Sequence, residues 1–293
     1  MMRKVSLMFA LPLVCLAACG QQDDIFLGEP SAPSSERGVA TMRLTRAESD
    51  GFAAAGVSDV TILIYRVNGK TTELFENSTV NVGSGEFQYE FSLGETYRTL
   101  ALANVTASGV EAVETLKLTI DPAGEKIPYT TPLTQFSSDK SVLNVGLELT
   151  RPVARLSFRP AEDAADLANV DFDEIRLTYS NVATTYMPSV GKPELTELTV
   201  SATKADGFAA TLYTYGTAST GELSTLTIDY YKNGTLVNTS SSPLETGTAW
   251  EASRAYTVIV PITADDYVQT PWAGRPARVN RAAKAVTIIE SAL

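Results

Sequence analysis

Carboxylates are the titratable side chains plentiful enough to form an active site in this chain, whose 293 residues include two cysteines and no histidine. Imidazole serves as base or ligand in Ser-His-Asp and Cys-His catalysis, in HExxH zinc sites and in the facial-triad iron sites, so these classes are excluded. A glycosidase needs two carboxylates facing each other across a sugar, which sequence spacing cannot show, so a carboxylate-based hydrolase stays a remote alternative. We therefore expect a protein that is not an enzyme, with no catalytic residues, no metal site and no cofactor.

The charge balance is acidic, with 23 Lys and Arg against 34 Asp and Glu and a formal net charge of −11. Neutralising phosphates requires clustered cations, so we expect no nucleic-acid partner. The hydrophobic content of 44% is ordinary for a globular protein. The length suggests about two domains of roughly 150 residues each.

Both cysteines lie close to the N-terminus, and their surroundings are informative. A basic start is followed by an apolar run over residues 5–14 and by Leu-Ala-Ala-Cys, which ends at Cys19. This order is typical of a secretory signal peptide, and the run is shorter than the ~18 residues that span a bilayer. The last four residues resemble the bacterial lipobox, which implies removal of residues 1–18 and acylation of Cys19. The alternative is an ordinary signal peptide cut nearby.

The segment after the cleavage point points to a location. Residues 19–38 hold two prolines and several serines without hydrophobic alternation, so we expect a flexible tether. Gly20 departs from the aspartate of an inner-membrane retention signal, and residues 22–24 (QDD) are similar to the acidic surface-export signal of lipoproteins in some Gram-negative anaerobes. The alternative is an ordinary acidic linker. These features predict a lipid-anchored protein of the outer membrane that faces outward.

From Val39 onward the dominant period is two, the pattern of strands with one buried face. Apolar and polar residues alternate in four clear stretches, at residues 86–93, 116–120, 175–179 and 256–262. Residues 60–67 and 99–105 are apolar almost throughout and predict strands covered on both faces. Asn-Gly dipeptides at residues 68–69 and 233–234 favour two-residue type I′ hairpin turns. Together these signals predict an all-β fold of antiparallel β-sandwiches.

A weak internal repeat in the sequence suggests where the chain divides into two domains. The alternating strands at residues 39–46 and 153–159 each precede a loop and then a longer strand. We therefore place a boundary near Thr150, between an N-terminal domain over residues 39–150 and a C-terminal domain over residues 151–293.

The order of these elements resembles the fimbrillin superfamily, the lipoprotein subunits and anchors of surface fimbriae in Gram-negative anaerobes. The matching pieces are the lipobox at Cys19, the first strand with its arginines, and the segments at residues 59–69, 95–104 and 149–158. The resemblance implies two tandem transthyretin-like β-sandwich domains. It also implies a structural component of fimbriae that supports adhesion, with other fimbrial subunits as partners and a host or bacterial surface molecule as ligand.

The resemblance further implies a way of assembling. In fimbrillin-type pilins an arginine-specific protease removes the first strand, and a strand from another subunit refills the groove through backbone hydrogen bonds. Arg46-Ala47 follows the first strand here and is the candidate cleavage point, with Arg37 and Arg43 as rivals. The competing interpretation is that Arg46 is a solvated residue at the end of a strand.

A polymerising subunit also needs a strand to donate. Residues 283–289 (AKAVTII) are apolar and β-branched enough to supply one. The competing interpretation is an ordinary last strand or a terminal helix that docks on its own domain. An anchor keeps its first strand and its lipid, so the sequence leaves the anchor, accessory, stalk and tip roles open.

The alternative function is that of a surface glycan-binding lipoprotein. Trp250 and Trp272 lie in loop-like contexts, where exposed indole rings can stack on sugars. The competing interpretation is that both rings plug the ends of a sandwich.

Overall fold

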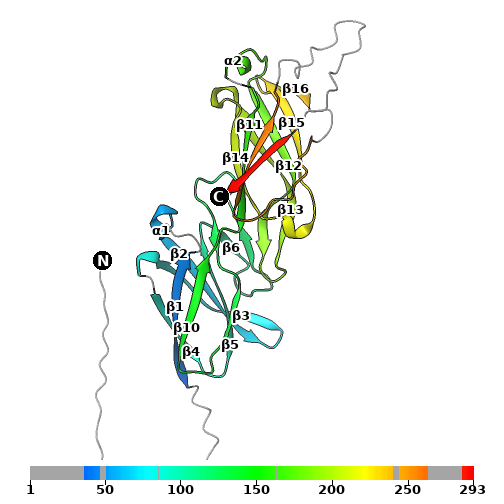
Figure 1. Cartoon of the computed structure of the whole chain (residues 1–293). Coiled ribbons are helices and arrows are strands. Elements are labelled where there is room, and N and C mark those ends of the chain that lie inside the picture. The colour runs from blue at the N-terminus through cyan, green and yellow to red at the C-terminus, as the bar shows by residue number, and fades with distance from the viewer. Residues whose placement is uncertain (1–35, 47–50, 85, 163, 240–243, 263–285) are drawn as a thin grey trace, which may run out of the picture. The chain divides into compact units, whose positions relative to one another are not determined.

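The computed structural model describes residues 36–46, 51–84, 86–162, 164–239, 244–262 and 286–293. Strands dominate these ranges, which confirms the all-β prediction (Figure 1). The helical elements are short, namely α1 (Gly51–Ala54), α2 (Ala164–Leu167) and the 3-10 turns η1 (Val82–Ser84), η2 (Lys204–Asp206) and η3 (Ala218–Thr220). No helix in the described ranges is long and apolar enough to cross a membrane.

The N-terminal half contains two sheets that share one core. The first has the strand order β10-β1-β4 and consists of β1 (Arg37–Arg46), β4 (Glu86–Ser92) and β10 (Val142–Leu149). The second has the order β3-β2-β5-β8, with β9 also on β5, and consists of β2 (Asp59–Asn68), β3 (Thr71–Asn81), β5 (Thr96–Ala103), β8 (Tyr129–Thr130) and β9 (Thr134–Ser137). Met42 and Leu147 from the first sheet meet Ile62 and Tyr97 from the second in this core.

The C-terminal half is also built from two sheets. One has the order β14-β11-β18-β19 and consists of β11 (Val153–Pro160), β14 (Ala210–Tyr215), β18 (Arg254–Val260) and β19 (Thr287–Ala292). The other has the order β16-β15-β12-β7-β6, with β13 on β12 and β17 on β15, and consists of β6 (Thr106–Ser108), β7 (Lys117–Thr119), β12 (Glu174–Met187), β13 (Lys192–Thr203), β15 (Thr225–Lys232), β16 (Thr235–Thr239) and β17 (Leu244–Glu245). Phe158, Leu177, Ile228 and Trp250 lie in the core between them.

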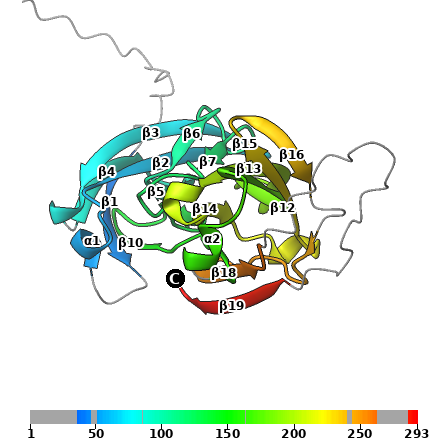
Figure 2. The ribbon, with the colours of Figure 1, turned by 90° about the horizontal axis from the view of Figure 1, so that it is seen from above.

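The two halves repeat one pairing pattern, in which the first strand lies inside its sheet. β1 runs parallel to β10 and antiparallel to β4, and β11 runs parallel to β18 and antiparallel to β14. The sheets are otherwise antiparallel, as expected, so each half adds a single parallel pair. The C-terminal half also adds β19, which lies along the outer side of β18 in Figure 2.

The two apolar runs fall in β2 and β5, and both strands are buried on both faces. One face of each packs into the core of its own half. The other face contributes Leu63 and Leu100 to a further core, which also contains Leu118 of β7 and Tyr215 of β14. The uninterrupted apolar sequence of these strands therefore has a physical reason, since neither face meets water.

The two halves of the fold are not separated at a single point in the sequence. β6 and β7 precede residue 150, yet β7 pairs with the end of β12, with Leu118 opposite Tyr186. The division into residues 39–150 and 151–293 therefore stays a prediction. Arg37 and Gly38, which the sequence assigned to the tether, are the first residues of β1.

The two Asn-Gly dipeptides form different turns. Asn233 and Gly234 both have positive φ, 49° and 74°, so the β15–β16 hairpin has the predicted type I′ geometry. In the β2–β3 hairpin Asn68 still pairs with Thr71, and Gly69 with φ 64° is the first turn residue. The turn there begins one residue later than the sequence suggested.

Candidate functional site

β1 is enclosed by neighbours on both of its edges. Eight of its residues are in register with β10 and seven with β4. Its inward side chains Ala40, Met42 and Leu44 are at most 5% exposed, so the strand supplies a full row of the core. Arg37 and Arg43 point outward. Removing β1 would therefore open a groove with hydrogen-bonding backbone on both walls and core side chains at its floor.

The groove is narrow at the end where β1 begins. A Cβ on Gly38 would lie 2.6 Å from Cε2 and 2.7 Å from Cζ of Phe91, and 3.0 Å from the Ser141 carbonyl oxygen. Phe91 is 4% exposed, and its ring is 6.2 Å from the ring of Tyr97 between centroids. The ring therefore has little freedom to move, and glycine is the residue that fits this position.

The outward face of β1 is paired with carboxylates on β4. The Arg37 guanidinium lies 3.1 Å from the Glu90 carboxylate. Arg43 stands directly opposite Glu86 and donates to it from Nε at 2.9 Å. Both pairs are well exposed, so each contributes little to stability, but together they match β1 to its neighbour in charge and register.

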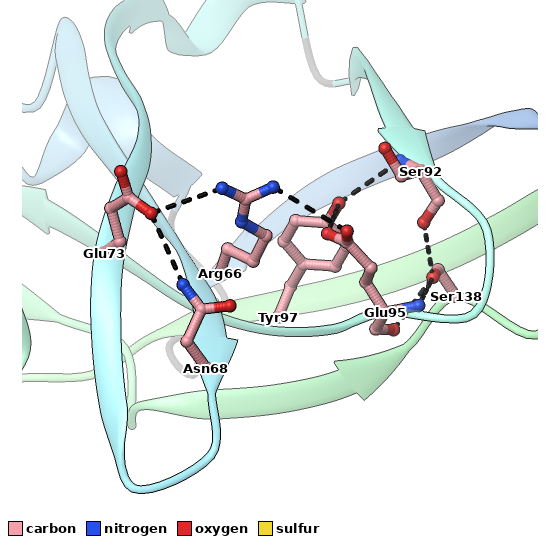
Figure 3. A network of polar contacts seen from close by, with 7 residues as sticks. All are labelled: Arg66, Asn68, Glu73, Ser92, Glu95, Tyr97 and Ser138. Atoms are coloured by element: carbon pink, nitrogen blue, oxygen red, sulfur yellow. Dashed lines mark hydrogen bonds and ion pairs between the residues drawn. The ribbon is translucent and has the colours of Figure 1, made fainter. Parts of the chain in front are cut away.

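A polar network fastens the end of the sandwich at which β1 enters (Figure 3). The buried Tyr97 hydroxyl donates to the Glu95 carboxylate at 3.0 Å and accepts the Ser92 backbone N–H at 3.2 Å. Burial, together with the adjacent Glu95 carboxylate, raises the pKa of the Tyr97 hydroxyl. Glu95 also lies 3.7 Å from Arg66, which bonds Glu73 at 3.2 Å.

Ser138 completes this network from the loop before β10. Its hydroxyl accepts the Glu95 N–H at 2.8 Å, and it lies 2.7 Å and 2.8 Å from the carbonyl oxygens of Ser92 and Glu95, to which it can donate. The connections β4–β5 and β9–β10, which both cross between the sheets, are thereby held together. None of the seven residues in Figure 3 belongs to β1. The network therefore links the end of β4 to the loop before β10 through contacts that include no residue of β1.

The candidate cleavage point lies at the other end of β1, and the structure describes its first residue. The Arg46 guanidinium carbon is 5.2 Å from the centre of the buried Tyr129 ring, and its Nη1 donates to the Gly51 carbonyl oxygen. Arg151 approaches the same ring and donates from Nε to the Tyr129 hydroxyl at 3.0 Å. Arg46 is thus engaged by the fold rather than extended into solvent. Ala47 lies outside the described residues, as does the lipidation candidate Cys19.

Of the two tryptophans considered for glycan binding, the structure describes Trp250. Trp250 is 0% exposed and meets the Tyr256 ring edge-on at 5.0 Å between centroids. Its ring offers no face to a sugar, because it fills the core of the C-terminal half. Trp272 lies outside the described residues.

The C-terminal strand β19 pairs with β18 in the C-terminal half of the same chain. Six of its residues pair with β18, and Glu290 lies 3.4 Å from Arg254 across the ladder. Most of β19 is exposed, and Ile288 is its one partly buried residue that packs against the core. The segment 283–289 is described only from Val286 onward.

Asp171 and Asp173, two carboxylates just before β12, have structural partners. Asp171 pairs with Lys232, and Asp173 accepts the Asn233 N–H at 2.8 Å. No group of three or more potential metal ligands occurs among the residues that the structure describes.

The fold can be compared with known proteins. No protein-family model matches the sequence, and no curated protein matches it. Solved structures do match in fold. A "putative adhesin" from Bacteroides ovatus superimposes with a TM-score of 0.52 at 12% identity, covering 76% of this chain and 88% of the other. A second "putative adhesin", from Bacteroides ovatus ATCC 8483, gives 0.52 at 12% identity and covers 89% and 100%. "Putative polysaccharide binding proteins" from Bacteroides thetaiotaomicron give 0.52 at 11% identity and cover 77% and 92%.

At these identities the similarity establishes a shared fold. The names of these proteins refer to adhesion and to polysaccharide binding, and they describe those proteins. The function of this chain has to be argued from its own residues.

Sequence reasoning identified β1 and Arg46 but missed the residues that shape the groove. Gly38, Phe91 and Ser138 carry no local signal, because their contacts join segments 43 or more residues apart. The alternation that exposes Glu86 and Glu90 was visible, and three arginines in β1 were too. Pairing them required the register between strands that are far apart in sequence.

Proposed function

We propose that this protein is a cell-surface lipoprotein and a structural component of fimbriae, which assembles by β-strand addition and supports adhesion. The observation that carries the proposal is the position of β1, which is the first strand of the described residues and yet lies between β10 and β4. A first strand in the middle of a sheet can leave without breaking the rest of the chain. The vacancy then accepts a strand from another subunit.

The proposed assembly step uses backbone chemistry. A cut after Arg46 frees β1, and the groove then presents unpaired N–H and C=O groups of β10 and β4. An incoming strand satisfies both rows, while its alternate side chains replace Ala40, Met42 and Leu44. Because Arg46 is held over Tyr129, the cut requires this end of β1 to open first.

The proposed location rests on the N-terminal sequence. Acylation of Cys19 would anchor the chain to the outer membrane, since several acyl chains together form a stable anchor. An anchor or accessory subunit keeps this lipid and its own β1, whereas a stalk subunit loses both by cleavage after Arg46.

Mass spectrometry of the N-terminus, on protein taken from native fimbriae, tests the proposal. A lipidated Cys19 on the assembled form supports an anchor or accessory subunit. A chain beginning at Ala47 supports a stalk subunit. A chain that begins at neither residue, or that is absent from purified fimbriae, refutes the proposal.

Glycan binding is a second candidate, and a cleft favours it. The cleft has a volume of about 390 Å³ and is lined by Tyr186, Tyr215, Pro188 and Pro193 among others. The two tyrosine rings lie 5.6 Å apart between centroids, and Tyr186 is partly exposed. A glycan array with the native chain, Tyr186→Ala and Trp272→Ala tests it. A sugar signal that either substitution abolishes favours this function, and no signal from the native chain excludes it for the glycans on the array.

A further inference from the structure

The groove around β1 has a charge pattern that says which strand it accepts. Glu86 and Glu90 on β4 and Glu148 on β10 are exposed on the outer face of this sheet. Neither β4 (EFQYEFS) nor β10 (VLNVGLEL) contains a lysine or arginine. Among the three strands of this sheet, the outward cations are Arg37 and Arg43 of β1. Without β1, the strands beside the groove present two carboxylates on β4 and one on β10, and no lysine or arginine.

The floor of the groove adds a size pattern. The inward positions of β1 run from Gly38 through Ala40 to Met42 and Leu44, so they grow along the strand. The small end is set by Phe91, whose ring would lie 2.6 Å from any Cβ at position 38. At the other end Met42 and Leu44 fill the core and are at most 5% exposed. The network of Ser138, Glu95 and Tyr97 lies at the narrow end and includes no residue of β1.

We propose that this groove selects a basic strand of another molecule, with cations at the two outward positions held by Arg37 and Arg43 and a glycine at the position of Gly38. The proposal rests on the proposed function, because it names the partner of the same groove. The two cations are six residues apart, on the outward side of the strand. The inward-facing residues of the incoming strand must be small near its start, at the positions of Gly38 and Ala40, and large near its end, at those of Met42 and Leu44.

The chain's own C-terminal strand does not meet this description. β19 (TIIESA) contains Glu290 and no cation, and Glu290 would meet the acidic walls unpaired. The adjoining residues 283–286 add a single lysine, Lys284, and no glycine. Like charges on neighbouring strands are destabilising, so β19 of a second copy is disfavoured as the incoming strand.

Peptide exchange on the full chain tests the selection. A specific protease site placed within residues 47–50 lets β1 be cut from the rest while it stays bound. The cut protein is then mixed with excess fluorescent peptide, and exchange is followed by anisotropy. The peptides are the native sequence 36–46, the same peptide with Arg37→Glu and Arg43→Glu, the same with Gly38→Val, and residues 283–293. A peptide with Arg37→Lys and Arg43→Lys is the matched control, because it keeps the charge.

The native and lysine peptides are expected to exchange alike. The charge-reversed peptide should bind about tenfold more weakly at low ionic strength, with a smaller difference in 1 M salt. The Gly38→Val peptide should bind roughly tenfold to a hundredfold more weakly at any salt, because overpacking is not screened. Glu86→Arg in the protein should restore binding of a peptide with Arg43→Glu, which a nonspecific charge effect would not do.

Equal binding of the native and charge-reversed peptides would overturn the selection, as would tight binding of residues 283–293 or no exchange by any peptide. These outcomes are separate from a failure of the proposed function. A chain that is missing from fimbriae but shows the selectivity refutes the fimbrial role and keeps the binding rule. A chain found in fimbriae whose groove binds every peptide alike refutes only the rule.

Discussion

Gly38→Ala is the substitution that most directly probes the narrow end of the groove. The added methyl would lie 2.6 Å from Cε2 of Phe91 and 3.0 Å from the Ser141 carbonyl oxygen, so the buried ring or the strand must shift. Overpacking of this kind costs about 1–3 kcal/mol. Replacing glycine also lowers the entropy of the unfolded chain, which offsets roughly 0.4–1 kcal/mol because φ at Gly38 is not positive. The expected net loss is about 0.5–2 kcal/mol.

Gly146→Ala is the matched control in the neighbouring strand of the same sheet. Gly146 stands opposite Arg43 and a Cβ there meets nothing within 4 Å, so only the favourable entropy change remains. We expect Gly146→Ala to be neutral or up to about 1 kcal/mol more stable than the native chain. Urea unfolding followed by far-UV circular dichroism measures both variants, with equal m-values required for the comparison. Gly38→Ala being as stable as Gly146→Ala would refute the close contact with Phe91.

Three further predictions concern other parts of the fold. Ser138→Ala leaves the Glu95 N–H without its hydroxyl acceptor and should lower the free energy of urea unfolding by about 1–3 kcal/mol; no loss would show that the network does not fasten this end. Trp250→Ala should cost about 3–5 kcal/mol in the same assay, because the buried indole leaves a cavity, whereas an unchanged stability would mean that the ring is not in the core. Burial raises the pKa of the Tyr179 hydroxyl in the folded state, whereas the unfolded state ionises near pH 10. The contribution of Tyr179 to the free energy of unfolding is therefore complete below about pH 10 and is lost as pH rises through the higher folded pKa. Tyr179→Phe should therefore lessen the fall in unfolding free energy between pH 9 and 11, and an identical fall in both proteins would contradict this.

The elements that could be predicted from the sequence are those whose reason is local. Residues 60–67 and 99–105 are apolar because both faces of β2 and β5 are covered, and a continuous apolar run indicates that directly. Asn233-Gly234 gives its turn because both residues tolerate positive φ.

The remaining features depend on partners that are distant in sequence. Nothing near Gly38 indicates that Phe91 will lie against it, and nothing near Arg43 indicates that Glu86 will stand opposite. Trp250 lies in the loop-like segment GTAWE (residues 247–251), whose sequence does not indicate that the indole ring is buried in the core. The parallel pairing of β1 with β10 is likewise a property of the whole half, since eight described strands, β2 to β9, lie between them in the chain.

The position of β1 also affects the order in which the strands of its sheet can pair as the chain folds. β4 follows β1 after some forty residues, but β10 follows only after about a hundred, with Val39 waiting for Val142. Contacts so distant in sequence form slowly, because a long loop must close before they contribute. Until residues 142–149 pair with β1, that strand lies at the edge of its sheet with a free row of backbone groups. During folding, a strand of another molecule can compete with β10 for this edge.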